Sequence, residues 1–248
     1  MDLLNILILL AVGLFAGCLN TLAGGGSLLS LPVLIFLGLP PNVANATNRV
    51  AIVLQNVFAV RGFKSKGVSV YPFNLWLGIS AFCGAIVGAF LAVDIDKEVF
   101  NRILAIVIVA VVVYMAINPL KNINKPENMG KKATITSIII FFFVGIYGGF
   151  IQAGVGYLMI MALTLVNGFS LVKTNSIKVF VALTYTLVAL GIFIYYGIVN
   201  WEFGIPLAIG NATGGWLASR WSVNKGDNWI RYIVMVTASA FAVKLFFF

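Results

Sequence analysis

Histidine is absent from this 248-residue sequence, and cysteine occurs only twice, as Cys18 and Cys83. Because histidine is the most common metal ligand and the usual proton carrier near neutral pH, its absence disfavours metal centres and histidine-dependent enzymes. Both cysteines lie within apolar stretches, where a role in packing is expected. Neither a nucleophile–base pair nor paired aspartates are evident. We therefore expect no enzyme, no metal site and no cofactor.

Charge is scarce as well: charged residues make up 9% of the sequence and hydrophobic residues 61%, whereas soluble domains are about 25% charged. Apolar stretches of roughly 20 residues, long enough to cross a bilayer as helices, recur from end to end. These features predict an all-α polytopic protein of the lipid bilayer. Membrane topology then explains the net charge of +9 better than binding to nucleic acid does. The first 27 residues lack the basic region of a signal peptide, so we expect them in the mature protein.

Two halves of the chain resemble each other across the longest polar linker, residues 121–132. We expect residues 1–120 and 133–248 to form two transmembrane repeats of inverted topology. The similarity is weak at each point but keeps its order, as the following pairs show: GLFAGCLNTLAGGGS (13–27) with GIYGGFIQAGVGYLM (145–159), Thr47-Asn48 with Thr174-Asn175, and GAIVGAFLA (84–92) with NATGGWLAS (211–219).

Each half contains about five apolar segments. The second segment of each half has about a dozen residues, too few to cross a hydrocarbon core of about 30 Å. Broken or re-entrant hairpins are therefore expected, and whether these short segments span the membrane stays open. The expected segments are 3–22, 27–38, 46–62, 70–92 and 99–117 in the first half, and 133–153, 157–167, 175–196, 201–219 and 229–247 in the second.

Basic residues alternate with acidic residues between successive loops. By the positive-inside rule, this places the linker in the cytoplasm and both termini outside, a side that is the periplasm if the membrane is a bacterial inner membrane. The basic group contains Arg61, Lys64, Lys66, residues 121–132, Lys173, Arg220, Lys225 and Arg231, and the alternate loops contain Asp94, Asp96, Glu98 and Glu202. Apart from Glu202, at the start of the expected segment 201–219, no acidic residue falls inside an expected span, which disfavours cation transport.

The stretch NTLAGGGSLLSLP (20–32) interrupts an apolar segment with three glycines, Gly24, Gly25 and Gly26. Lipid cannot satisfy the exposed backbone of such a run, so we expect these residues at a hairpin tip, with Ser27 capping the next helix. Gly154–Gly156 form the corresponding tip. Two such tips that meet would offer backbone N–H groups to an anion. Close helix packing is the alternative, and it is preferred for the pairs Gly13/Gly17, Gly84/Gly88, Gly145/Gly149 and Gly210/Gly214.

Arg49 opens a helix that also carries Asn48, Gln55 and Asn56 on neighbouring faces. An arginine at membrane depth costs at least about 2.5 kcal/mol, and its planar guanidinium matches an oxyanion. We therefore predict that it recognises the charge of an anion, the alternative being an interfacial arginine. In the second half, Lys178 is either a further anion contact or a topology charge.

The segment LNTLAGGGSLLSLPVLIFLGLPPNVANATNRVAI (19–52), followed by G-x-x-x-G-A-F-L-A (84–92), resembles the sulfite exporter TauE/SafE family. The resemblance extends over the whole chain, with AGVG in place of AGGG in the second half. It implies secondary, ion-coupled movement of sulfur-containing anions across the bacterial inner membrane. Carried onto matching positions, it implicates Asn20, Thr21, residues 24–27 and residues 45–49.

The sequence thus predicts a transporter of sulfite, thiosulfate or an organosulfonate such as sulfoacetate, working by alternating access. A carboxylate or other small-anion transporter, a passive anion channel and a non-transport scaffold remain alternatives. The coupling ion, a proton or sodium, stays open, with Glu202 as a weak candidate, as do the direction of transport and the oligomeric state. The candidate substrate-binding residues are Asn20, Thr21, Gly24, Gly25, Gly26, Ser27, Asn48, Arg49, Gln55, Gln152, Gly154, Gly156, Thr174, Asn175 and Lys178.

Overall fold

The computed structural model describes residues 1–93 and 126–230, together with positions 95, 96, 98, 99, 102, 103, 106, 109, 232, 233 and 236. Within these residues the protein is helical and has no strand, as predicted. The helices are α1 (Leu3–Leu22), α2 (Ser27–Phe36), α3 (Pro41–Ser65), α4 (Phe73–Val93), α6 (Lys131–Phe150), α7 (Val155–Asn167), α8 (Leu171–Tyr195) and α9 (Trp201–Lys225). They match eight of the ten expected segments to within a few residues. Most of 99–117 and of 229–247, like Asp94 and residues 121–125, lies outside the described residues.

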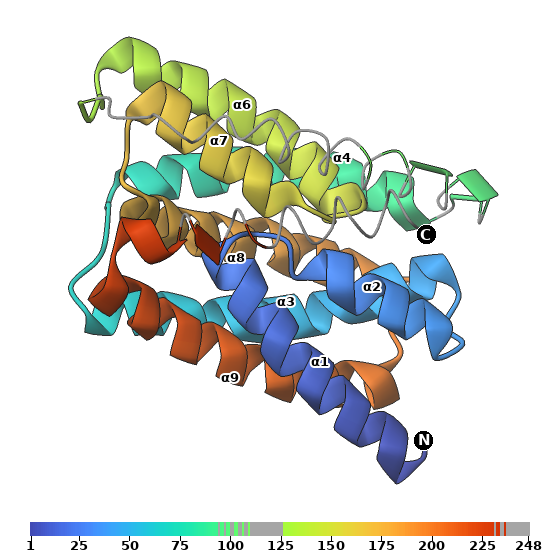
Figure 1. Cartoon of the computed structure of the whole chain (residues 1–248). Coiled ribbons are helices and arrows are strands. Elements are labelled where there is room, and N and C mark those ends of the chain that lie inside the picture. The colour runs from blue at the N-terminus through green and yellow to red at the C-terminus, as the bar shows by residue number, and fades with distance from the viewer. Residues whose placement is uncertain are drawn as a thin grey trace.

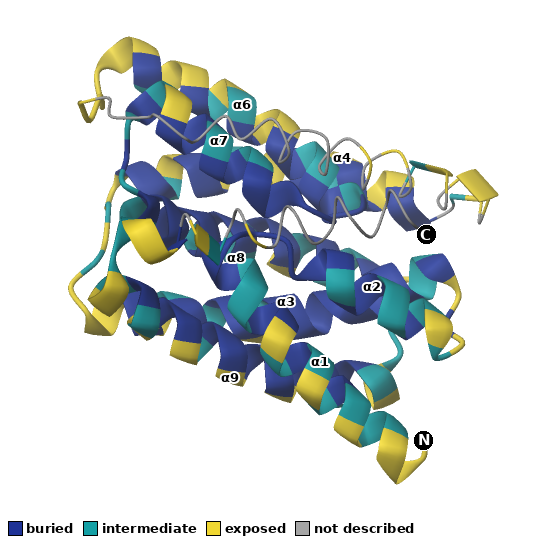
Figure 2. Cartoon of the chain, in the orientation of Figure 1, coloured by how far each residue is buried: buried dark blue, intermediate teal, exposed yellow. Residues whose placement is uncertain are grey.

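The helices are suited to a membrane. Four of them, α1, α4, α6 and α8, are long and apolar enough to cross a bilayer, and α2 and α7 are short apolar helices, as predicted. Large apolar side chains such as Phe15, Phe36 and Phe143 are more than half exposed on the outside of the bundle. Figure 2 shows the complementary pattern, with α3 and α8 mostly buried at the centre. Because water would disfavour so much exposed apolar surface, these faces are expected to contact lipid.

Equivalent helices of the two halves have equivalent packing partners. Helix α1 packs on α9 as α6 packs on α4, and α3 packs on α9 as α8 packs on α4. The paired glycines lie at these contacts: a Cβ atom at Gly13 would meet the backbone of α9, and one at Gly149 would meet the backbone of α4. The interpretation of the four glycine pairs as helix-packing sites is therefore confirmed.

Two helical hairpins enter the bundle from opposite ends. In Figure 1, α1 and α2 form one hairpin on the right, and α6 and α7 form the other on the left. Positive φ values break the helices between the arms, at Gly24 (+89°) in the first hairpin and at Gln152 (+66°) and Gly154 (+70°) in the second. Because the two hairpins enter from opposite ends, helices α1 and α6 run in opposite directions (Figure 1). This arrangement is compatible with repeats of inverted topology, which stay a prediction.

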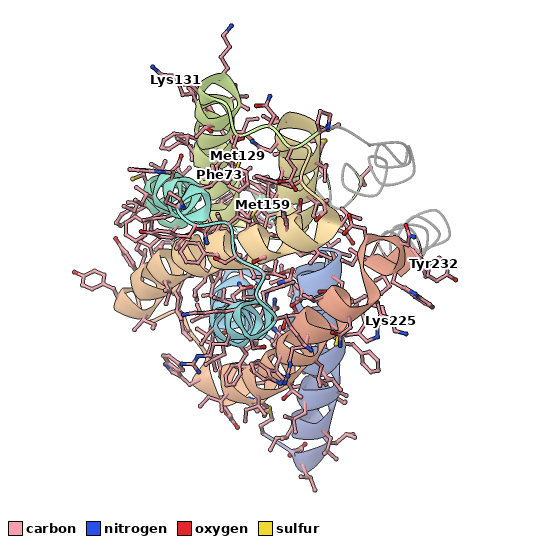
Figure 3. All side chains as sticks on the ribbon, turned by 90° about the vertical axis from the view of Figure 1, so that its left-hand side faces the viewer. Phe73, Met129, Lys131, Met159, Lys225 and Tyr232 are labelled. Atoms are coloured by element: carbon pink, nitrogen blue, oxygen red, sulfur yellow. The ribbon has the colours of Figure 1, made fainter. Side chains whose placement is uncertain are left out.

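Basic side chains gather at one end of the bundle. Figure 3 looks onto this end, where α6 begins and α9 ends, and Lys131 and Lys225 lie at the periphery. Glu202 begins α9 at the other end and forms an ion pair with the N-terminal ammonium group of Met1. The separation of charge agrees with the pattern read from the sequence, while the assignment of the ends to cytoplasm and periplasm stays a prediction.

Candidate functional site

The two hairpin tips touch each other between the halves of the molecule. A Cβ atom added to Gly24 would lie 2.5 Å from the Cα of Gly156, and one added to Gly156 would be just as crowded by Gly24. Side-chain Cβ atoms do not approach backbone this closely, so glycine is required at both positions. Gly25, next to the contact, lies against the ring of Tyr157. The expected meeting of the tips is therefore found.

The second tip differs from the prediction in one residue. Gly154 stands at the tip and directly precedes α7, as expected, but Gly156 lies in the first turn of α7. Gln152 supplies the other left-handed backbone position of this tip, where a non-glycine residue is uncommon. The hairpin thus turns through residues 151–154, and helix α7 begins sooner than the AGVG motif suggested.

The prediction that Ser27 caps α2 is wrong. Gly26 occupies the N-cap position without a side-chain cap, and Ser27 is the first residue of the helix. The Ser27 hydroxyl instead accepts a hydrogen bond of 3.3 Å from the amide nitrogen of Asn48, whose oxygen accepts one of 2.8 Å from Ser30. Most amides in the first turns of both helices donate to carbonyl groups at the tips: Leu28, Leu29 and Ser30 to Gly25 or Gly26, and Val155 and Tyr157 to Gln152 and Gly154. The positive ends of both helix dipoles face the tips.

Arg49 of α3 holds the end of α6. Its side chain is fully buried, and its guanidinium donates to the last carbonyl groups of that helix, which carry the negative end of the helix dipole. It also donates to the side-chain oxygen of Gln152 at the tip. The backbone acceptors are Gly148 (2.5 Å), Gly149 (3.1 Å) and Phe150 (3.4 Å), and Asn45 Oδ1 accepts at 3.3 Å.

In the second half, side chains of α8 donate hydrogen bonds to the carbonyl end of α1 in the same way. Lys178 Nζ donates to the carbonyl of Thr21 at 3.0 Å, and Asn175 Nδ2 donates to the carbonyl of Leu22 at 2.9 Å. Both side chains are buried. Each half therefore satisfies the buried carbonyl groups at the broken helix of the other half, which lipid could not do.

A small cavity lies beside the contact of the tips. Its volume is about 10 Å³ for the centre of a water-sized sphere, which is room for about one water molecule. Met159 of α7, labelled in the interior of the bundle in Figure 3, is part of its wall. The residues that line it come from α1, α3, the second tip, α7 and α8: Asn20, Asn56, Gln152, Val155, Gly156, Met159, Lys178, Val179, Ala182 and Tyr185.

The polar groups of this cavity are mainly hydrogen-bond donors. The Asn56 amide nitrogen is buried and has no hydrogen-bond partner among the described residues. The buried Tyr185 hydroxyl lies beside the side chains of Gln152 and Thr186. Lys178 uses one of its N–H groups on Thr21. Asn20 donates to Gln55 at 3.0 Å, which fixes its orientation. No carboxylate of the described residues lines the cavity, so its chemistry suits an anion.

The structure brings four of the predicted site residues to the cavity: Asn20, Gln152, Gly156 and Lys178. Arg49 stands behind Gln152, so its direct contact with an anion stays a prediction. Six cavity residues were missed. Five of them are apolar or aromatic residues of apolar helices, which give no signal of their own, and the sixth is Asn56, which the sequence placed beside Arg49 but not in the site. The apolar and aromatic residues are Val155, Met159, Val179, Ala182 and Tyr185. The other predicted residues lie outside the lining: Thr21, Gly24, Gly25, Gly26, Ser27, Asn48, Gln55, Gly154, Thr174 and Asn175.

A bundle of apolar helices in which two broken hairpins meet beside a buried polar cavity is the architecture of a membrane transporter. The comparisons with known proteins agree. The chain belongs to the sulfite exporter TauE/SafE family, whose sequence pattern matches residues 9–245. The family resemblance drawn from the motifs is thereby confirmed, and the protein is a member of a family of membrane transporters.

Related proteins cover nearly the whole chain. It is 25% identical over 244 residues to probable membrane transporter protein ORF9 of Sinorhizobium sp, covering 96% of this chain and 90% of the relative. It is 27% identical over 239 residues to a probable membrane transporter protein of Haemophilus influenzae (96% and 93%). It is also 27% identical over 242 residues to probable membrane transporter protein YfcA of Escherichia coli K12 (97% and 89%). No solved structure shows a significant match.

Proposed function

We propose that this protein is a secondary transporter that moves a small sulfur-containing anion by alternating access, with the cavity at the hairpin tips as its central site. Sulfite, thiosulfate and organosulfonates such as sulfoacetate form the substrate class. The family pattern supports a sulfur oxyanion. A carboxylate of similar size is the competing substrate, since it accepts the same hydrogen bonds.

The observation that carries this proposal is the polarity of the cavity. Three polar residues line it from α3 and α8: Asn56, Lys178 and Tyr185. The amide nitrogen of Asn56 has no partner among the described residues. A buried donor without an acceptor raises the free energy of the folded protein. Such a donor is therefore expected where a ligand accepts its hydrogen bond. An oxyanion accepts several hydrogen bonds at once, and the positive end of α7 adds to its stabilisation.

The size of the site supports alternating access. The cavity holds about one water molecule, so this conformation is closed around a space that is smaller than any oxyanion. The tips must separate for an anion to enter. If Gly24 and Gly156 separated, the site would open toward one end of the bundle. The hydrogen bonds of Arg49 to the end of α6 and of Lys178 to the end of α1 would meanwhile keep each hairpin in place. A permanently open channel lacks such a closed state.

The test is transport by the purified protein in liposomes. Vesicles loaded with unlabelled thiosulfate or sulfoacetate are diluted into the labelled anion. A carrier produces saturable, transient accumulation of label above equilibrium, whereas a channel produces simple equilibration. Acetate and malonate replace the sulfur anions in parallel vesicles. Counterflow with a sulfur anion and not with its carboxylate counterpart supports the proposal. Counterflow with carboxylates alone, or no flux at all, contradicts it.

A further inference from the structure

We propose that Lys178 is the coupling group: its amine takes up one proton when the anion enters the cavity and releases that proton when the anion leaves. The inference rests on the proposed function, because it names the coupling ion of the same site. From the sequence alone, Lys178 is either an anion contact or a topology charge, and the coupling ion stays open. The surroundings of the side chain decide between these possibilities.

Lys178 is deeply buried: its relative exposure is 3%. The residue lines the cavity, and its Nζ atom donates to one neutral acceptor, the carbonyl of Thr21. A topology charge at a helix end would reach water or a headgroup, as Lys173 does one turn earlier on α8. Lys173 is 44% exposed and pairs with Glu127 at 2.6 Å. The two lysines of this helix thus occupy opposite environments.

No negative side chain faces Lys178 among the described residues. Among the residues that the structure describes, the only other cation near the cavity is Arg49, which acts through Gln152. The nearby titratable groups are Tyr185, which lines the cavity, Tyr147, which donates to the carbonyl of Ala153, Tyr157 of α7, which lies against Gly25, and Cys18, which donates to the carbonyl of Gly214. The other titratable residues of these helices, Arg61, Lys64, Lys131, Lys132, Lys173 and Tyr195, do not line the cavity.

An ammonium ion enclosed without a counter-ion is unfavourable, because its hydration is lost and no negative charge replaces it. A neutral amine still donates one N–H group to Thr21. An anion in the cavity supplies the missing counter-charge, and the amine lone pair then accepts a proton from a hydronium ion on the side of entry. The resulting ammonium–anion pair loses its proton to water on the side of exit, so anion and proton move together.

Arg49 is unsuited to this role. Guanidinium groups stay protonated in proteins, and this one is bound to the carbonyl end of α6. Sodium is also disfavoured as the coupling ion, since no carboxylate among the described residues reaches the cavity to bind it. Glu202, the weak candidate from the sequence, pairs with the terminal ammonium of Met1 and does not line the cavity.

Proton uptake on binding is measured by isothermal titration calorimetry of the detergent-purified protein. Thiosulfate and sulfoacetate are the probes, because their charge is constant around neutral pH. The same titration is repeated in two buffers that differ in ionisation enthalpy, and the difference in apparent enthalpy gives the number of protons bound. We expect about one proton per anion for the parent protein.

Three variants test whether Lys178 binds the proton that is taken up. Lys178→Arg keeps a permanent charge, so it is expected to bind the anions without proton uptake. Lys178→Gln is expected to bind at least tenfold more weakly, also without uptake, and Lys173→Gln is expected to match the parent. Anion binding by the parent without proton uptake overturns this inference and leaves the proposed function standing. Undiminished uptake in either Lys178 variant also overturns it. Absence of binding to any anion of the class contradicts the proposed function itself.

Discussion

Gly24 and Gly156, from opposite halves of the chain, bring their backbones into direct contact where the two hairpin tips meet. Neither position has room for a methyl group, and Gly24 also has a left-handed φ of +89°. The contact closes one side of the polar cavity, to which Gly156 contributes. The closed site therefore depends on glycine at both positions.

Replacement of Gly24 by alanine should disrupt this closed state. The added methyl group would meet the backbone of Gly156 at 2.5 Å, and overpacking of this kind costs about 1–3 kcal/mol. We expect a lower thermal unfolding midpoint and loss of anion counterflow. Gly191→Ala is the matched control, because Gly191 lies in helix α8 with open space around its Cα. Equal midpoints and equal transport in the two variants would contradict the importance of the contact.

Removal of the Arg49 side chain should destabilise the second hairpin. Arg49→Ala leaves the carbonyl groups at the end of α6 without their donor, and unsatisfied buried groups of this kind cost about 1–3 kcal/mol each. We expect a thermal midpoint well below that of the control Arg61→Ala, whose side chain is exposed at the end of α3. A folded Arg49→Ala protein that binds and transports the anion as well as the parent would remove Arg49 from the site.

Lys178 should contribute most of the charge recognition. In Lys178→Gln the ammonium group that faces the cavity is lost, and a charge-assisted hydrogen bond is worth about 1.5–3 kcal/mol, which is tenfold or more in affinity. Lys173→Gln, the same substitution on the same helix, removes an exposed ion pair and should leave affinity unchanged. Thiosulfate titrations of both variants provide the comparison. Equal affinities would show that the anion binds elsewhere.

Two tyrosines should respond differently to loss of their hydroxyl groups. Tyr185 lines the cavity and its hydroxyl lies beside Gln152 and Thr186, so Tyr185→Phe should weaken anion binding about tenfold with a smaller loss of stability than Tyr147→Phe. The Tyr147 hydroxyl donates to the carbonyl of Ala153 at the second tip, so Tyr147→Phe should lower the thermal midpoint. Paired melting and binding curves measure both effects, and the reverse pattern would contradict the assignment of donors to the cavity.

Much of the helical framework could be predicted from the sequence because it depends on local signals. Apolar stretches and their polar boundaries located the helices, and the small-residue spacing of pairs such as Gly13/Gly17 marked the helix contacts. The glycine run at residues 24–26 located the first break. In the second half Gln152 takes a left-handed conformation, which its residue type does not favour, so the limits of that tip were misplaced.

The candidate site was less predictable because it depends on tertiary contacts. The Arg49 sequence context gave no indication that its guanidinium would meet the carbonyl end of α6, since Gly148 lies 99 residues away. The choice between a topology charge and a site residue for Lys178 required its burial, which the sequence does not specify. Tyr185 became a candidate only through its place in the wall of the cavity. Charge and glycine patterns thus identified the region, and packing selected the residues.

The most direct test of the account is thermal stabilisation of the purified protein by a panel of small anions at equal ionic strength. The panel contains sulfite, thiosulfate, sulfoacetate and their carboxylate counterparts, and is repeated with Lys178→Gln and Lys173→Gln. We predict that a sulfur anion raises the midpoint of the parent and of Lys173→Gln, and that Lys178→Gln loses this response. A flat response of the parent across the panel, or an undiminished response in Lys178→Gln, would contradict an anion site at the hairpin tips.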